Sequence, residues 1–418
     1  MSSAEQLVAR LLGPEGQALA AAVDALPAAE RATPRAVAAL RRLGDAELVA
    51  LALRVAEAET RRPLKFPAAE PLRFTPELLE QASAHPVASH RAARLAPFGP
   101  VLDLGCGAGG DLTRLAAAGA RVAGLEADPL AAALARANLA ALGLEGEVVT
   151  GRHPGTPLPA HRALFLDPAR RAAGPRGRRR RDPRAFSPSA AEVAALLRRS
   201  DAWCLKWGPA LPLDDDELAG PDGPLAGLAA GDWELETVSW RGELREAVLW
   251  GGAARRGATR QATLLDGDVE RWATHAYRGD GRVPTPTPAP PGPWLHEPDP
   301  ALIRAGLLDA FATEHGLAPV APAIAYLTGD ATRSPFLRRW PLLEQLPLSI
   351  PALQAALDRH DAGPLVLKKR GFPLDPETLR PRLRTGGKRP VTVLIYRDRR
   401  APGGHEHQVC VCGEQAGE

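Results

Sequence analysis

The segment VLDLGCGAGGD, residues 101–111, combines a glycine-rich loop with two carboxylates. Gly105, Gly107 and Gly109 lie between an apolar run and a helical pattern. Glycines allow the chain to turn sharply and let a ligand approach the backbone closely. The helix that follows would present free N–H groups and the positive end of its dipole. This pattern predicts a ligand site at a junction between a strand and a helix.

Two kinds of adenosine-containing cofactor fit this loop. Gly105, Gly107 and Gly110 match the dinucleotide fingerprint G-x-G-x-x-G. Glu126 follows 21 residues after Gly105, where an acidic residue would bind ribose hydroxyls. Asp103, just before the first glycine, favours S-adenosylmethionine (SAM), because its carboxylate can hold the amino group of the methionine part and would sit poorly beside a pyrophosphate. NAD(P) and a loop with a purely structural role are the other interpretations.

The expected cofactor contacts come from this loop and from the end of the next strand. We expect Glu126 to accept hydrogen bonds from the ribose diol; an exposed carboxylate near a helix start is the other interpretation, and Asp128 is the expected N-cap. The position after the third strand reads Gly-Arg-His at 151–153, not acidic, so the sequence assigns no adenine contact. The expected contacts are Asp103, Gly105, Cys106, Gly107, Gly109, Asp111, Glu126 and Ala127.

A second motif, DPARR at residues 167–171, follows the fourth apolar run. Ligands bind α/β sheets at this carboxyl edge, so Asp167, Pro168 and Arg170 are the predicted catalytic residues. Methyl transfer mainly requires a well-placed nucleophile and exclusion of water. Asp167 could orient an amine or a hydroxyl or accept its proton, or it could only shape the turn. Arg170 stands where enzymes that methylate exocyclic base nitrogens often carry an aromatic residue, so the motif does not support base-amine methylation directly.

An arginine-rich stretch follows directly, with eight arginines between residues 170 and 184. Such a block repels itself unless something anionic orders it. Its place beside the predicted catalytic edge favours a phosphate-bearing substrate, whereas a solvated surface loop is the simpler interpretation. The predicted RNA-binding residues in this stretch are Arg171, Arg178, Arg179 and Arg180.

The surrounding elements alternate between strand and helix patterns. Apolar runs of strand length appear at 101–105, 121–128, 147–151, 163–168 and 202–207, with helical patterns between them and a pair of alternating strands at 233–240 and 243–250. Alternation of this kind predicts an α/β fold with a mostly parallel sheet covered by helices.

The remaining segments set the expected domain organisation. Residues 1–60 are helical in pattern, and Thr75 with Pro76 marks the start of a further helix. The C-terminal region combines helices around 301–316 and 349–360 with strands at 365–371 and 391–398. We therefore expect a helical domain at 1–73, a methyltransferase domain at 74–281, a Pro-rich linker at 282–293 and a small α+β domain at 294–418.

Bulk composition limits the protein's class. The net charge of +3 is too small to demonstrate a nucleic-acid partner. Four cysteines make no disulfide framework, and the sequence shows neither a signal peptide nor a membrane span, so we expect a cytoplasmic protein without a membrane partner. His405, His407, Cys410 and Cys412 could bind zinc, but their spacing is not that of a standard finger, and a terminal strand without metal is expected.

Taken together, these motifs resemble the class I SAM-dependent methyltransferases that carry a C-terminal THUMP-like domain. The resemblance runs from FTPELLEQAS and HRAARLA through VLDLGCGAGGD, GLEAD and FLDPARR to SWRGELREAVLW, WLHEPDPALIRAG and LVLKKRGF. DPARR together with HEPDPALIRAG is its most specific part. It implies a Rossmann-like seven-stranded sheet whose last strand is antiparallel, with SAM as cofactor.

The resemblance also implies RNA as the substrate class, because THUMP domains accompany many RNA-modifying enzymes. Lys368, Lys369 and Arg370 are the predicted RNA contacts of the C-terminal domain, with a solvated loop face as the other interpretation. An enzyme that methylates a small molecule or a protein, and a non-catalytic RNA-binding protein that kept the cofactor fold, remain as rival hypotheses. The oligomeric state is not indicated.

Overall fold

The fold is that of a computed structural model, which describes residues 1–168, 188–206, 218–220, 225–229, 231–281, 283–373, 375, 378–400 and 406–417. The predicted site residues Arg170, Arg171, Arg178, Arg179 and Arg180 lie outside the described residues. The chain divides into two compact units, the first made of residues 1–235, 245–257 and 265–273 and the second of residues 236–244, 258–264 and 274–418.

The N-terminal region is helical, as expected. Ser2, Thr33 and Asp45 each accept a hydrogen bond from a backbone N–H of the helix that they precede, which stabilises the helix start. The elements are α1 (Ser3–Leu12), α2 (Pro14–Asp24), α3 (Pro34–Leu40), α4 (Ala46–Glu59) and the 3-10 helix η1 (Arg62–Leu64).

Strands and helices then alternate along the chain. Thr75 and Pro76 take the predicted N-cap and first helical positions of α5. The elements are α5 (Pro76–Gln81), α6 (His85–Leu95), η2 (Ala96–Phe98), β1 (Val101–Leu104), α7 (Gly110–Ala117), β2 (Val122–Glu126), α8 (Pro129–Ala141), β3 (Glu147–Thr150), β4 (Ala163–Leu166), α9 (Ala190–Leu197), β5 (Ala202–Lys206), β6 (Trp233–Trp240), β7 (Glu243–Gly252), β8 (Arg260–Gly267) and β9 (Trp272–Gly279).

These strands form a nine-stranded sheet with the order β3-β2-β1-β4-β5-β7-β6-β8-β9. Strands β1 to β5 are parallel, and β7 runs antiparallel beside β5. The first seven positions of this order are the predicted Rossmann-like methyltransferase sheet with its antiparallel strand. Strands β8 and β9 extend it, and the sequence analysis did not predict them.

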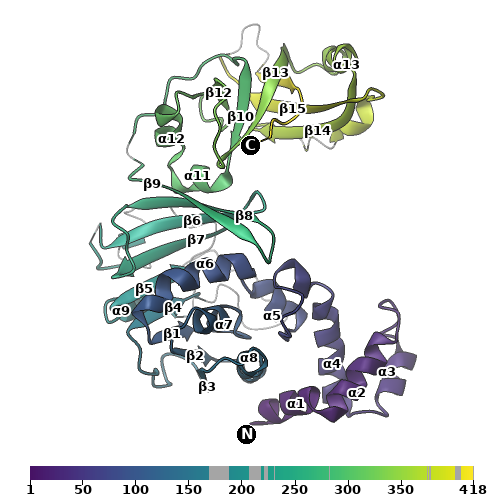
Figure 1. Cartoon of the computed structure of the whole chain (residues 1–418), viewed down its shortest axis with the longest axis vertical. Helices are drawn as coiled ribbons and strands as arrows, with labels where there is room; N and C mark the ends of the chain where they lie inside the picture. Colours follow the sequence, from purple (N-terminus) through teal and green to yellow (C-terminus); the bar gives the residue numbers. More distant parts are fainter. Residues whose placement is uncertain are drawn as a thin grey trace. The chain divides into compact units, whose positions relative to one another are not determined.

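The central strands are buried on both faces, which explains their continuous apolar runs. Val101 and Phe165 pack in one cluster with residues of α6, α7 and α8. Leu102 and Leu164 point to the other face and pack with residues of α9. Figure 1 shows α6, α7 and α8 beside the strands β1 to β5. The sheet is therefore a rigid support whose carboxyl edge carries the predicted site.

The N-terminal helices share a core with this sheet domain. Their buried leucines cluster with Leu134 of α8 and with Ala108 of the glycine loop. Asn138 of α8 accepts a hydrogen bond from the Arg73 N–H at 2.7 Å and donates to the carbonyls of Arg73 at 3.0 Å and Ala108 at 2.8 Å. The amide of Asn138 thus fastens residue 73 to the glycine loop. The domain boundary at residue 73 stays a prediction.

A second sheet lies in the C-terminal region, with the order β11-β12-β10-β13-β16-β15-β14. The region is the expected small α+β domain, but the predicted helix at 301–316 is split in two, because Gly306 takes a left-handed conformation (φ 69°) after α11. The elements are β10 (Trp294–Pro298), α11 (Pro300–Ala305), α12 (Leu308–Glu314), β11 (Ala318–Pro319), β12 (Leu327–Gly329), β13 (Leu337–Pro347), α13 (Ile350–Arg359), β14 (Ala362–Arg370), η5 (Arg380–Arg382), β15 (Arg389–Arg397) and β16 (His407–Cys412).

Candidate functional site

The glycine loop connects β1 to α7 and is shaped by two glycines in particular. Gly109 has φ 83°, and a Cβ added there would lie 3.2 Å from the Cβ of Ala135 in α8. Gly107 has φ 55°, and a Cβ there would meet no described atom within 4 Å. The loop therefore packs closely on α8 at Gly109 and turns bare backbone toward open space at Gly107, as a ligand-binding loop requires.

Asp103 lies on β1 with only 1% of its surface exposed. Within the described part of the chain, its Oδ2 atom is buried and has no hydrogen-bond partner. Burial, together with the negative charges of Asp111 and Asp167, raises the pKa of Asp103 well above its usual value. A buried carboxylate in this state would be stabilised by a cationic ligand.

Glu126, at the end of β2, braces the glycine loop. Its Oε2 accepts a hydrogen bond from the Gly107 N–H at 2.8 Å, and its Oε1 accepts one from the Asp128 N–H at 2.8 Å. Each carboxylate oxygen can accept more than one hydrogen bond, so Glu126 can still bind a diol. Asp128 is the N-cap of α8, as predicted, and accepts from the Leu130 N–H at 2.8 Å. Ala127, between the two acidic residues, is exposed.

Asp111 forms an ion pair with Arg91 of α6, which is 2% exposed. The same guanidinium forms an ion pair with Glu246 of β7 and donates to the Ser83 Oγ at 2.7 Å. Burial opposes ionisation of Asp111, but the Arg91 charge holds the pKa of Asp111 below its usual value. Burial raises the pKa of Glu246, although Arg91 opposes this shift. Arg91 thus joins α6, α7 and β7 beneath the predicted cofactor loop.

Asp167 directly follows β4 and meets Lys206, the last residue of β5. The Lys206 Nζ donates to the Asp167 Oδ2 at 2.6 Å and to the Ser83 Oγ at 3.2 Å. Burial is the largest single effect on Lys206 and disfavours its charge, but the carboxylates of Asp167, Asp111 and Glu246 together raise the pKa of Lys206. A Cβ added at Gly105 would have the Asp167 carbonyl oxygen as its nearest neighbour, at 3.8 Å. The predicted catalytic edge therefore adjoins the glycine loop.

Comparison with known proteins identifies the family. A family model described as a methyltransferase domain matches residues 101–165, and one described as THUMP domain-like matches residues 337–414. An uncharacterized S-adenosylmethionine-dependent methyltransferase of Mycobacterium tuberculosis is 37% identical over 328 residues, which are 78% of this chain and 84% of the relative. The chain belongs to the S-adenosylmethionine-dependent methyltransferases.

A solved structure supports the fold of this methyltransferase. The crystal structure of a Porphyromonas gingivalis W83 protein classed as a methyltransferase superimposes with a TM-score of 0.69. The match covers 95% of this chain and 98% of that one at 21% identity. The similarity thus extends over both sheets of the methyltransferase.

SAM, the cofactor of the family, carries a positively charged sulfur and an ammonium group. The described site fits it: Asp103 offers a buried carboxylate oxygen without a partner, and Gly107 faces open space. Asp111 is held by an ion pair with Arg91, and its predicted contact with the cofactor stays a prediction. Cys106 is buried against Gly124, where a Cβ would lie 2.7 Å from the Cys106 Sγ, and so it packs the loop onto β2.

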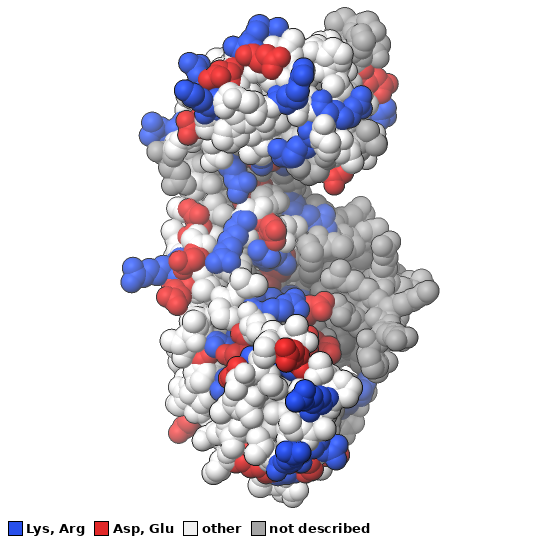
Figure 2. All heavy atoms as spheres, turned by 90° about the vertical axis from the view of Figure 1, so that its right-hand side faces the viewer, with Lys and Arg blue, Asp and Glu red and all other residues white. Residues whose placement is uncertain are grey.

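The predicted RNA contacts of the C-terminal domain lie on β14. The Lys368 Nζ donates to the Glu297 Oε2 at 2.6 Å and lies over the Trp340 ring. Arg370 is 4.0 Å from Glu297 and lies over the Tyr326 ring. The C-terminal domain, at the top of Figure 2, shows basic side chains with acidic ones between them. Lys368 and Arg370 thus have structural partners, and their RNA-binding role stays a prediction.

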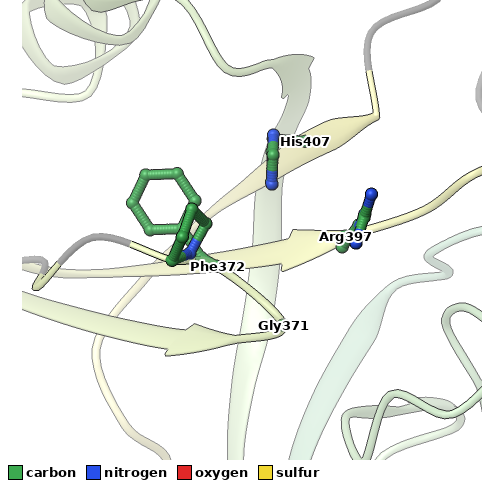
Figure 3. Close-up of a pocket in the computed structure, with 5 residues that line it drawn as sticks. Gly371, Phe372, Arg397 and His407 are labelled. Carbon is green, nitrogen blue, oxygen red and sulfur yellow. The ribbon is translucent and has the colours of Figure 1, made fainter.

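The terminal strand β16 contains three of the four residues that the sequence analysis weighed as zinc ligands, His407, Cys410 and Cys412, whereas His405 lies outside the described residues. Cys410 and Cys412 are buried in the core of the C-terminal domain. His407 lies beside a hollow of about 300 Å³ that Phe372 and Arg397 also line, and Figure 3 shows these side chains on separate segments. Among the described residues, no group of three or more His, Cys, Asp or Glu side chains is placed to hold a metal.

The helices that the structure describes include none with the length and apolar character of a membrane span.

Three residues of the site were missed by the sequence analysis: Arg91, Lys206 and Glu246. Arg91 could have been noticed, because it stands on the otherwise apolar face of α6 with Val87 and Ala88. Lys206 ends an apolar strand at the edge where ligands bind, which is a weaker signal. Glu246 lies inside an alternating strand pattern and carries no sequence signal of its own.

Proposed function

We propose that this methyltransferase acts on RNA, either tRNA or rRNA, and that methyl transfer takes place at the carboxyl edge of β4 beside Asp167. The observation that carries the proposal is the THUMP domain-like match at residues 337–414 on the same chain as the cofactor loop. THUMP domains accompany many RNA-modifying enzymes, although the link is by analogy. The arginine-rich sequence between residues 170 and 184 agrees with a polyanionic substrate.

In this proposal the protein's residues divide into three groups: those that bind SAM, those that act on the acceptor and those that bind RNA phosphates. Bound SAM supplies a methyl group on a positively charged sulfur. Asp103 holds the ammonium group, Glu126 the ribose diol, and the backbone of the glycine loop lies against the cofactor. The remaining cofactor contacts are Gly105, Cys106, Gly107, Gly109, Asp111 and Ala127.

The acceptor would enter beside β4. Asp167 orients the acceptor and takes its proton, since its carboxylate is partly exposed at this edge. Pro168 and Arg170 continue the catalytic edge in the sequence. Phosphate groups of the RNA would be bound by Arg171, Arg178, Arg179 and Arg180 and, in the C-terminal domain, by Lys368, Lys369 and Arg370.

The test uses SAM labelled in its methyl group and total RNA from a strain that lacks this gene. We expect label in RNA with the intact protein and none with the Asp167→Ala variant, whose SAM binding is checked by calorimetry. Label in proteins or small metabolites, and none in RNA, would contradict the RNA assignment. SAM binding without transfer to any acceptor would indicate a non-catalytic RNA-binding protein.

A further inference from the structure

The cation at the predicted catalytic edge constrains the chemistry of the acceptor atom. Lys206 is the last residue of β5, and its side chain is only 11% exposed. Its ammonium group is 2.6 Å from the Asp167 Oδ2 and 3.2 Å from the Ser83 Oγ. An ammonium group has three N–H donors, and within the described residues Asp167 and Ser83 accept from two of them. An acceptor that approaches Asp167 therefore comes close to a positive charge.

This charge favours oxygen over nitrogen as the nucleophile. A hydroxyl can donate its proton to Asp167 and accept a hydrogen bond from Lys206 at the same time. The oxygen becomes more negative as it loses that proton, and a neighbouring cation stabilises this change. An exocyclic base amine is a poor hydrogen-bond acceptor, because its lone pair is delocalised into the ring. Its nitrogen gains positive charge during methylation, which Lys206 would oppose.

The charges around Lys206 keep it in its cationic form. Burial and the charge of Arg91 oppose its protonated state, but Asp167, Asp111 and Glu246 together favour it and raise its pKa. A cation held in place before the reaction stabilises developing negative charge without reorganisation. Lys206 therefore serves as a fixed electrostatic partner for an oxygen atom.

The sequence beside Asp167 points the same way. Recognition of a flipped base relies on stacking between aromatic or apolar side chains. The motif continues as Pro168-Ala169-Arg170-Arg171, without an aromatic residue. Arginines suit the sugar–phosphate backbone of RNA better than the face of a single base in a hydrophobic pocket.

We propose that Lys206 is a catalytic residue and that the acceptor is a ribose 2′-hydroxyl of RNA, an inference that rests on the proposed RNA methylation. The acceptor oxygen bonds to the methyl carbon, the bond from that carbon to the sulfonium sulfur breaks with its electron pair left on sulfur, and the hydroxyl proton passes to Asp167. Asp167, whose side chain is 29% exposed, then releases the proton to solvent.

Alkaline hydrolysis distinguishes the two kinds of product. Alkali cleaves RNA through attack by the 2′-oxygen, so a 2′-O-methyl group protects the adjacent phosphodiester. RNA methylated with labelled SAM is digested with alkali and separated by charge. We expect the label in dinucleotides. Label in mononucleotides overturns the hydroxyl assignment but leaves RNA methylation standing, whereas no label in RNA overturns both.

Substitution of Lys206 tests its role separately. Lys206→Met should lower the methylation rate about 10²–10³-fold, the effect of removing a preorganised donor. SAM affinity, measured by calorimetry, should change less than threefold, which also shows that the variant is folded. Lys206→Arg keeps the charge and should recover part of the rate. A Lys206→Met protein that methylates RNA at the wild-type rate would overturn the assignment.

Discussion

The Lys206 ammonium and the Asp167 carboxylate meet at 2.6 Å because their strands are neighbours in parallel register. Leu205 of β5 pairs with Leu166 of β4, so the next residue of each strand reaches the same edge of the sheet. A shift of one residue in this register would turn one side chain to the opposite face. The chemistry at this edge thus depends on strand pairing.

Asp103→Asn should weaken SAM binding while stabilising the free protein. The variant loses the charge that holds the ammonium group, which we expect to cost about 1.5–3 kcal/mol of binding free energy. Without ligand, the wild-type carboxylate is buried at a cost, as the raised pKa of Asp103 indicates. Calorimetry and urea unfolding at pH 8 measure the two effects. A variant that loses both affinity and stability would assign Asp103 a structural role instead.

SAM affinity should increase with pH until the raised pKa of Asp103 is passed. Below that pKa the free protein carries a protonated Asp103, whereas the ammonium group requires the carboxylate, so binding releases a proton. The affinity then changes by up to about tenfold per pH unit in that range. Calorimetric titrations in buffers of different ionisation enthalpy measure how many protons are released when SAM binds. The Asp103→Asn variant is the control and should lack this dependence.

Arg91→Met should destabilise the protein strongly, because it leaves Asp111 and Glu246 without their shared cation. Removing one partner of a buried ion pair costs about 3–5 kcal/mol of unfolding free energy. The matched control is Arg54→Met, which breaks the exposed pair with Glu77 and should cost less than about 1 kcal/mol. Urea denaturation measures both. An equal loss of unfolding free energy in the two variants would show that Arg91 does not stabilise the protein by joining Asp111 and Glu246.

RNA binding should weaken with salt in proportion to the phosphates that are contacted. Replacing Arg178, Arg179 and Arg180 together by alanine should reduce the slope of log affinity against log salt by roughly 2–3. The control is a triple alanine variant that loses the same charge elsewhere, in the N-terminal region. It replaces three exposed arginines, Arg35, Arg41 and Arg42. Filter-binding assays at a series of salt concentrations measure the RNA affinity of both variants and of the wild-type protein. An unchanged slope in the first variant, or an equal change in both, would remove the arginine stretch from the interface.

Local sequence patterns were sufficient to predict the central fold. Strand β4 is an uninterrupted apolar run, β1 is apolar except for Asp103, and caps such as Asp128 act through neighbouring residues. Strand β9 was missed because much of it is exposed and its pattern is weak, whereas β8 buries the polar side chains of Gln261 and Thr263 and so lacks a continuous apolar run. β13 was missed because Pro341 and several charged residues interrupt its run.

The site, like the fold, could be predicted from the sequence only in part. The positions of Asp103, the glycine loop, Glu126 and Asp167 follow from strand ends, which a sequence reveals. The cluster of Arg91, Asp111 and Glu246 joins residues up to 155 positions apart, and nothing in the local sequence signals that proximity. The position of Arg91 on an apolar helix face hints at a buried charge, but its partners are known only from the packing of α6 against the sheet.

The three hydrogen bonds of Asn138 connect the segment before α5 to the cofactor loop. A side chain that holds both Arg73 and Ala108 couples movement of the chain at residue 73 to movement of the cofactor loop. Such coupling is reciprocal, so SAM should slow amide hydrogen exchange around residue 73 as well as in the loop. The first helices pack in the same cluster as Ala108 of this loop, so removing them should also change the affinity for the cofactor.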